Sequence, residues 1–217
     1  MNELNRRSYD AIAGQWAAAR RELPALDREY VEAVFADLAP GARVLDAGCG
    51  TGRPIAALAV ARDLAITGID QSPAMLAHAE REFPAATWRL GRLEDVDFDG
   101  PYAGALLWDV LFHLPRERHA PLLARLVAAL ADGARLALTI GGSAPAPRGF
   151  IDTMFDRPFF YDSHAPAVVG ELLRGLDVSV EREGFVNPPS GGRDKGRYAY
   201  VLRKAGGARM ASRSGLG

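Results

Sequence analysis

The residues best suited to chemistry run from Val44 to Gly52 and read Val-Leu-Asp-Ala-Gly-Cys-Gly-Thr-Gly. An apolar segment leads directly into glycines at every second position, and an acid, Asp46, precedes them. Glycines at such a place let the backbone approach a ligand closely and turn sharply into a helix. The pattern predicts a ligand site at the carboxyl edge of an α/β sheet, the alternative being a glycine-rich turn with a structural role only.

A second carboxylate, Asp70, ends another apolar segment 18 residues after Gly52. A carboxylate at that place can accept hydrogen bonds from both hydroxyls of a ribose. Together, Asp46 and Asp70 predict a ligand with a positively charged amino-acid end and a nucleoside end. A dinucleotide site is disfavoured, because the third glycine comes one position early, Arg53 stands where that site has glycine, and Asp46 would repel a pyrophosphate.

Segments of strand and helix character alternate around these residues. This rhythm predicts a parallel, doubly wound α/β sheet, with a closing antiparallel pair formed by the last two strands. Ser72 and Pro73 are typical of a helix N-terminus. The expected helices cover 6–20, 25–39, 54–61, 72–82, 116–131 and 165–175, and the expected strands cover 42–46, 64–70, 87–90, 102–108, 134–140, 177–184 and 198–204.

The same pass along the chain predicts its domain organisation. Residues 1–40 are expected to form an N-terminal helical lid, and residues 41–204 the main domain. Within that domain, residues 141–175 are expected to form a lid-like loop and a helix over an acceptor pocket. The Gly- and Ser-rich residues 205–217 are predicted to be a disordered tail.

Composition excludes several classes of function. The 217 residues are 48% hydrophobic and 24% charged, as in ordinary globular proteins, and the net charge of −1 gives no basic excess for binding nucleic acid. No apolar run reaches the ~18 residues that a membrane span needs. The single cysteine can form neither an internal disulfide nor a zinc site by itself, and the first residues lack a secretory apolar region, so we expect a cytoplasmic protein without a metal.

Two segments, Val44–Gly52 and Ile69–Leu76, resemble the first two motifs of class I (Rossmann-like) S-adenosylmethionine (SAM)-dependent methyltransferases of the small-molecule type. The resemblance covers roughly residues 40–140. The resemblance implies a three-layer α/β/α fold with a seven-stranded, mostly parallel sheet, an antiparallel last strand and N-terminal helices. It also implies that Asp70 holds the ribose and that the methionine end is held by Asp46, Gly48, Cys49, Gly50 and Gly52.

Other cofactor contacts follow from the same resemblance. Gln71 and Met75 would flank the adenine, and its amino group would meet either Glu94 or the backbone at Leu93, because Arg92 stands where the family commonly has Asp. Trp108 would lie beside the methionine moiety, and Tyr9 of the N-terminal lid would close over the cofactor.

The acceptor side is less defined by the sequence. His113, just after the fourth strand, is the candidate general base if the acceptor must lose a proton, the alternative being a histidine that only packs at a helix start. Trp16, Tyr161 and His164 could wall an acceptor pocket or fill core. Arg148, Arg193 and Lys195 could meet an acidic acceptor or be solvated. Asn187-Pro188-Pro189-Ser190 is interpreted as a proline-rich loop.

The sequence therefore predicts a SAM-dependent methyltransferase. A methyl group would pass from SAM to an oxygen, nitrogen, sulfur or carbon atom of a small molecule, leaving S-adenosylhomocysteine (SAH). The small size, the lack of a basic patch and the aromatic residues near 159–161 favour a small acceptor over nucleic acid. The alternatives are a SAM-binding regulator or partner subunit without activity, and an NAD-linked oxidoreductase.

Overall fold

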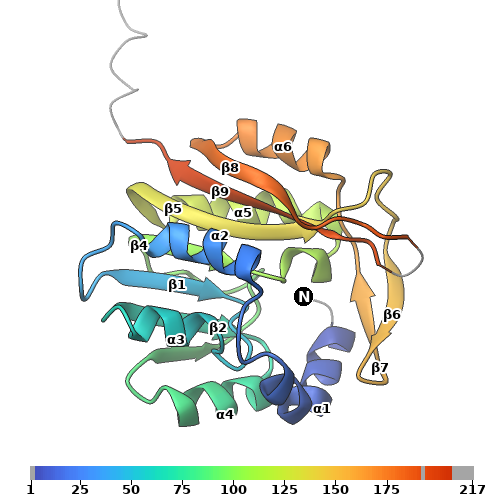
Figure 1. The fold of residues 1–217 in the computed structure, drawn as a ribbon, viewed down its shortest axis with the longest axis horizontal. Helices are drawn as coiled ribbons and strands as arrows, with labels where there is room; N and C mark the ends of the chain where they lie inside the picture. The colour runs from blue at the N-terminus through green and yellow to red at the C-terminus, as the bar shows by residue number, and fades with distance from the viewer. Residues whose placement is uncertain (1–2, 192–193, 207–217) are drawn as a thin grey trace, which may run out of the picture.

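A computed structural model describes residues 3–191 and 194–206 (Figure 1). Its helices are α1 (Glu3–Ala19), α2 (Ala25–Phe35), α3 (Ile55–Val60), α4 (Pro73–Glu82), α5 (His119–Ala128) and α6 (Pro166–Arg174), with short 3-10 turns η1 (Leu111–His113) and η2 (Arg116–Arg118). Its strands are β1 (Arg43–Ala47), β2 (Ala65–Asp70), β3 (Thr87–Leu90), β4 (Tyr102–Leu107), β5 (Leu130–Gly141), β6 (Phe150–Met154), β7 (Arg157–Tyr161), β8 (Val178–Asn187) and β9 (Arg197–Lys204).

Seven strands form the central sheet, in the order β3-β2-β1-β4-β5-β9-β8. The first five run parallel, and β9 lies antiparallel between β5 and β8. This arrangement confirms the predicted fold class, including the reversed last strand. Because β1, β2 and β4 are parallel neighbours, their carboxyl ends share one edge of the sheet, on the side where α1 and the β6–β7 hairpin lie (Figure 1).

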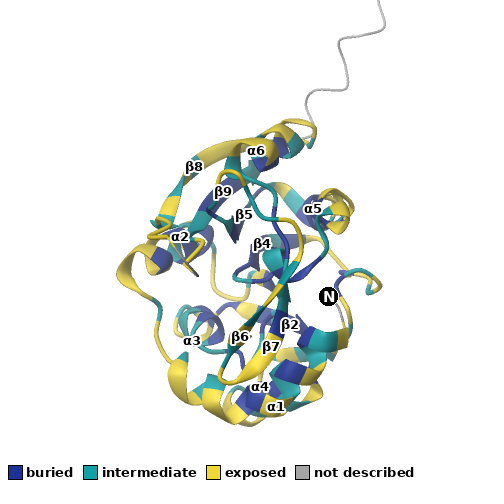
Figure 2. Cartoon of the chain, turned by 90° about the vertical axis from the view of Figure 1, so that its right-hand side faces the viewer, coloured by how far each residue is buried: buried dark blue, intermediate teal, exposed yellow. Residues whose placement is uncertain are grey.

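The sheet is buried on both faces, as continuous apolar strands require. Adjacent residues alternate between two cores: Val44 belongs to the core that includes residues of α2 and α3, whereas Leu45 belongs to the core that includes residues of α5 and α6. The same alternation recurs in β4, at Leu106 and Leu107. In the edge-on view of Figure 2, α2 and α5 accordingly lie on opposite sides of the central strands. The sheet is thereby held rigid, and its carboxyl edge is a fixed platform for a site.

The expected loop over 141–164 is wrong for residues 150–161, which form the antiparallel β6–β7 hairpin. Phe155 and Asp156 connect the strands and both have positive φ, at 48° and 58°. Two consecutive left-handed residues make the tight turn that suits the strand twist, but such turns usually contain Asn or Gly. The sequence therefore does not predict the hairpin, because its turn lacks Asn and Gly and because Pro158 lies within one of its strands.

Several boundaries also differ from expectation, among them the end of α2 at Phe35 rather than 39 and the end of β8 at Asn187 rather than 184. The helix predicted over 116–131 divides into η2 and α5, which ends at Ala128, and β5 begins at Leu130 rather than at 134. Leu130 is buried and pairs with Tyr102, so tertiary pairing wins over the helical spacing there. Within the described part of the chain, no helix combines the length and apolarity needed to cross a membrane. Of the predicted tail, residues 207–217 lie outside the described residues.

Candidate functional site

The glycine-rich loop after β1 adopts a conformation that requires glycine. Gly48, Gly50 and Gly52 have φ of +86°, +52° and +80°, in the left-handed region that side chains disfavour. A Cβ on Gly48 would come within 2.3 Å of a Val110 methyl group. The amides of Gly48 and Cys49 both donate to the carbonyl of Ile69, at 2.7 and 3.1 Å. The loop after β1 is thus fixed against the end of β2.

Asp70 holds the same loop from the other side. Its Oδ2 accepts from the Gly50 amide at 2.9 Å, and its Oδ1 accepts from the Ser72 amide at 2.8 Å. Burial raises the pKa of Asp70, and these backbone hydrogen bonds act against that rise. Each carboxylate oxygen can accept more than one hydrogen bond, so Asp70 keeps capacity for a hydroxyl-bearing ligand.

Asp46 lies two residues before Gly48 and is 2% exposed. Its Oδ2 is buried and has no hydrogen-bond partner among the described residues. Burial and the charge of Asp70 raise the pKa of Asp46 to about 8. A buried acceptor without a partner is costly, and a ligand cation would satisfy it.

A cavity of about 70 Å³ opens onto these carboxylates at the carboxyl edge of the sheet. Besides backbone of the glycine loop it is lined by aromatic side chains from α1 and from the end of β4. Trp108 also has a buried Nε1 without a partner among the described residues. Its lining includes Tyr9, Trp16, Arg20, Asp46, Gly48, Cys49, Gly50, Asp70, Met75, Trp108, Asp109 and His113.

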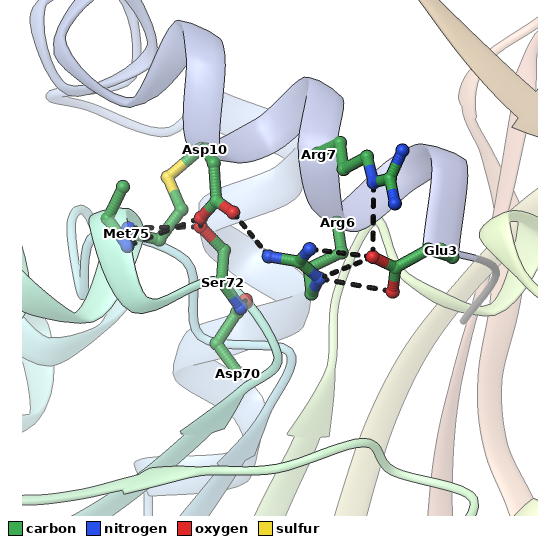
Figure 3. A network of polar contacts seen from close by, with 8 residues as sticks. Glu3, Arg6, Arg7, Asp10, Asp70, Ser72 and Met75 are labelled. Carbon is green, nitrogen blue, oxygen red and sulfur yellow. Dashed lines mark hydrogen bonds and ion pairs between the residues drawn. The ribbon is translucent and has the colours of Figure 1, made fainter.

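Helix α1 covers this cavity and is attached to α4 through Asp10. Ser72 caps α4 as predicted, its Oγ accepting from the Met75 amide at 3.1 Å. The Ser72 hydroxyl in turn donates to Asp10 Oδ1 at 2.6 Å, and the Ala74 amide lies 3.3 Å from the same oxygen. Figure 3 shows Asp10 between Ser72 and Arg6, which pairs with Asp10 Oδ2 at 2.7 Å. A carboxylate of one helix therefore extends the cap of another.

His113 is buried where α1, η1 and β7 meet. Its Nδ1 lies 3.0 Å from the carbonyl oxygen of Phe160, which can only accept, and 3.2 Å from the amide nitrogen of Asn5. Because that nitrogen already donates to the Phe160 carbonyl, at 3.0 Å, we assign a proton to Nδ1. Nε2 is then free to accept from the Tyr9 hydroxyl, 2.8 Å away. Burial lowers the pKa of His113 to about 4, so the imidazole is neutral at pH 7. Asn5 supports this arrangement, its amide bonding the Phe160 backbone at 2.7 and 3.0 Å.

Asp109 follows β4 and is a third carboxylate at this edge. Its backbone is left-handed, with φ of 57°, and its amide donates to Thr139 Oγ1 at 2.7 Å. Its carboxylate accepts from Arg20 at 2.9 Å and from Arg197 at 2.8 Å. A strained backbone at such a position is held by its surroundings and is typical of functional sites.

A second cavity, of about 320 Å³, adjoins the first. Both cavities are lined by Tyr9, Trp16, Arg20, Asp109 and His113, which therefore form the wall between them. The remaining walls come from η1, the β6–β7 hairpin and the segments before β6 and β9. They include Phe112, Phe150, Asp152, Tyr161, Asp162, Asp194, Lys195 and Arg197.

The structure places the predicted site residues in three groups. Tyr9, Asp46, the loop residues from Gly48 to Gly50, Asp70, Met75, Trp108 and His113 come together at the first cavity, and Trp16 and Tyr161 line the second. Gly52, Gln71, Leu93 and Glu94 line neither, and their cofactor contacts stay predictions.

Arg148 and His164, two of the other predicted acceptor residues, also lie outside both linings. Arg148 is exposed, and His164 packs its ring edge-on against His119, with centroids 5.5 Å apart. Arg193 lies outside the described residues. Lys195 does line the second cavity. In the described ranges, no group of three or more His, Cys, Asp or Glu side chains could hold a metal ion.

Sequence reasoning missed Asn5, Asp10, Arg20, Asp109 and Arg197. The sequence did carry a signal for Asp109. It lies at the carboxyl end of a buried strand, as Asp46 and Asp70 do. Asn5, Asp10 and Arg20 carried no such signal, since a polar residue on an amphipathic helix normally faces solvent.

Comparisons with known proteins agree with this geometry. A model of the methyltransferase domain matches residues 44–133. A trans-aconitate 2-methyltransferase from Methylobacterium radiotolerans is 34% identical over 176 residues, covering 76% of this chain and 63% of the relative. Another from Methylobacterium nodulans is 38% identical over 112 residues, covering 51% of this chain and 42% of the relative. The matched part of the chain thus spans less than two thirds of the length of these curated relatives.

Solved structures share the fold at lower identity. The DhpI–SAH complex superimposes with a TM-score of 0.68 at 22% identity, covering 94% of this chain and 99% of that one. The [4+2]-cyclase SpnF gives a TM-score of 0.71 at 18% identity, covering 93% and 95%. At such identities the likeness concerns the fold alone, and one fold carries different reactions.

The sheet order, the glycine loop and the two strand-end carboxylates define a doubly wound α/β protein with its site at the carboxyl edge of the sheet. The domain match assigns residues 44–133 to the methyltransferase domain family. In sequence and in fold, the chain is similar to class I, Rossmann-like SAM-dependent methyltransferases.

Proposed function

We propose that this protein transfers the methyl group of SAM to a small-molecule acceptor and releases SAH. The observation that carries the proposal is the pair of adjoining cavities, one beside two buried carboxylates and one beside an aromatic hairpin, with one shared wall. Methyl transfer needs two molecules held in line at close range, and holding them so supplies most of the acceleration. Two cavities that meet at Tyr9, Trp16 and His113 suit that requirement.

The chemical groups that line the first cavity suit the cofactor, which would need more room than the volume of about 70 Å³ left beneath α1. When bound, SAM supplies a methyl group already activated by a sulfonium. Asp46 would accept from its ammonium group, since Oδ2 is buried and has no other partner among the described residues. Asp70 would accept from the ribose hydroxyls, and backbone of Gly48, Cys49 and Gly50 would border the methionine end.

Helix α1 acts in this proposal as the lid. Tyr9 and Trp16 cover the cavity with rings packed edge-on, 5.7 Å between centroids, and would exclude water. We further propose His113 as the proton acceptor where the acceptor must lose a proton. Its Nε2 faces the Tyr9 hydroxyl, so the proton would reach it through that hydroxyl rather than directly. The imidazole is neutral at pH 7 and can accept, but burial lowers its pKa to about 4 and makes it a weak base, so it suits an acceptor that loses its proton readily.

The acceptor is proposed to be a small molecule and not nucleic acid, in keeping with a net charge of −1 and a second cavity of about 320 Å³. The cytoplasm is the compartment we propose, from the single cysteine, which argues against an oxidising environment.

Calorimetry with SAM and SAH tests the proposal directly. The unmodified chain should bind both, and Asp70→Asn should weaken binding about a hundredfold by removing charge-assisted hydrogen bonds. Asp46→Asn should weaken it about tenfold. Asp63→Asn is the matched control, because Asp63 is exposed in the turn before β2. Unchanged affinity in both site variants would refute the assignment of the first cavity.

Two alternatives give different results in the same preparation. A SAM-binding protein without activity would bind SAH yet never transfer label from methyl-tritiated SAM to any acceptor. An NAD-linked oxidoreductase would be stabilised against heat by NAD rather than by SAH.

A further inference from the structure

The second cavity has the walls of a site for flat rings. Phe112 and Tyr161 lie nearly parallel, with centroids 6.1 Å apart and 29° between planes. Phe150 continues the series at 5.5 Å and 21° from Tyr161. Together with Tyr9 and Trp16, these rings give the cavity five aromatic side chains. Such surfaces favour a planar ligand, which stacks on them at little cost in conformational entropy.

The charges around this cavity are compensated within the protein. Arg20 and Arg197 reach its lining, yet both bind Asp109. Arg197 also pairs with the buried Asp27, at 2.8 Å. These two arginines therefore face two carboxylates, which leaves no net positive charge to attract an anion.

The remaining carboxylates make the balance more negative. Asp162 pairs with Arg116 at 2.6 Å. Asp194 accepts from Ser190 at 2.7 Å and from the Gly196 amide at 3.0 Å, and these hydrogen bonds lower its pKa, so it is ionised at pH 7. Counted with the partners Asp27 and Arg116, five carboxylates among the described residues face four cations: Asp27, Asp109, Asp152, Asp162 and Asp194 against Arg20, Arg116, Lys195 and Arg197. A ligand with several carboxylates would meet like charge here.

Size gives a further restriction. A volume of about 320 Å³ lies near the lower end of the ~300–1,000 Å³ of small-molecule pockets. This suits an acceptor of about two fused rings.

We propose that the second cavity binds a flat, uncharged aromatic acceptor that stacks on Tyr161, and that it discriminates against polycarboxylates. The inference rests on the proposed methyl transfer and names the acceptor class of that same site. It separates this chain from the relatives named for trans-aconitate, because Arg20 and Arg197, the arginines among the described lining residues, are already paired within the protein.

Calorimetry on the full chain saturated with SAH tests the proposal, with 2-naphthol as the aromatic probe and trans-aconitate as the acid. We expect 2-naphthol to bind at least about tenfold more tightly than trans-aconitate. Tyr161→Leu should weaken 2-naphthol binding about tenfold by removing the ring at similar volume. Phe155→Leu is the matched control: it removes an aromatic ring from the same hairpin, outside the cavity lining.

Failure of this inference and failure of the proposed function are separable. Absence of SAH binding removes the proposed function itself. If SAH binds, three results overturn the acceptor class: tighter binding of trans-aconitate, no binding of 2-naphthol, or equal 2-naphthol affinity in Tyr161→Leu and the unmodified chain. Should Tyr161→Leu not fold, judged by its thermal melt, Phe150→Leu tests the same wall.

Discussion

The two cavities differ in how the chain builds them. The first is assembled mainly from loops that follow β1 and β2, and backbone groups hold it: left-handed glycines, and amides that donate to Asp70 and to the Ile69 carbonyl. The second is assembled from α1, η1, the β6–β7 hairpin and the segment before β9, and side chains hold it, among them Asn5, Asp109 and Arg197.

This difference shows which part of the site is free to vary. A cavity made by backbone geometry after parallel strands can be kept while the chain changes elsewhere, whereas a cavity held by side chains changes with few substitutions. If the first cavity holds the cofactor as proposed, we expect that side to be the constant part and the second cavity to set the acceptor specificity.

The largest expected effect is a backbone change on the cofactor side. Gly48→Ala places a Cβ in a left-handed conformation and within 2.3 Å of Val110. We expect the free energy of unfolding to fall by about 3 kcal/mol, measured by urea denaturation. Gly14→Ala is the control, because an added Cβ there meets nothing within 4 Å on the exposed face of α1. Equal effects of the two changes would mean that the loop is not held by its backbone.

On the acceptor side, a side-chain change should have the next largest effect. Asn5→Ala leaves the backbone amide and carbonyl of Phe160 without their partner. We expect a loss of about 2 kcal/mol in unfolding free energy. Binding of 2-naphthol should suffer more than binding of SAH, because the hairpin borders only the second cavity. Arg7→Ala, on the exposed face of the same helix, should change the stability little. A larger loss for SAH than for 2-naphthol would contradict the separation of the two regions.

The same contrast explains what could be predicted from the sequence. The order of strands and helices, the Ser72 cap and the clustering of Asp46, Gly48 and Asp70 followed from local patterns, since residues at the ends of neighbouring parallel strands meet at one edge. The contacts of Asn5 with Phe160, and of Arg20 and Arg197 with Asp109, join segments more than 80 residues apart. No local pattern records such pairings.

The β6–β7 hairpin shows a second reason why part of the structure could not be predicted from the sequence. Residues 150–161 are rich in aromatic side chains that favour strands, but Phe155 and Asp156 do not announce a turn, and neighbouring Gly and Pro suggested a loop. The site was therefore predictable where it depends on strand ends and unpredictable where it depends on which distant segments pack together.

Protonation of Asp46 should produce the next effect, on the cofactor side. Its pKa is raised to about 8, far above the ~3.9 of an unfolded chain. The protonated Asp46 carboxyl therefore stabilises the folded chain. This stabilisation has its full size at pH values below the pKa of Asp46 in the unfolded chain, and it is lost as the pH rises through the pKa of Asp46 in the folded chain. Between pH 5 and 7 the unfolding free energy should therefore fall by about 1.4 kcal/mol per pH unit relative to Asp46→Asn.

Urea denaturation of both chains in the absence of cofactor measures that difference. Binding of SAH should in addition release a proton near pH 7, since its ammonium group favours the ionised carboxylate; calorimetry in buffers of different ionisation enthalpy detects this release. Parallel pH profiles for the two chains would show that Asp46 is already ionised in the free protein.

The smallest expected effect lies where the two regions join. Asp10 of α1 accepts from the Ser72 hydroxyl and lies 3.3 Å from the Ala74 amide at the start of α4, so it connects the cover of both cavities to the cofactor side. Asp10→Ala should cost about 1 kcal/mol in unfolding free energy, as loss of a helix cap does. Because Ser72 also caps α4 by itself, Ser72→Ala should cost at least as much, and the double variant should cost less than the sum. Strict additivity would mean that α1 and α4 are not coupled through this contact. If they are coupled, SAH should dissociate faster from Asp10→Ala than from the unmodified chain, because α1 covers the first cavity; an equal dissociation rate would also contradict the coupling.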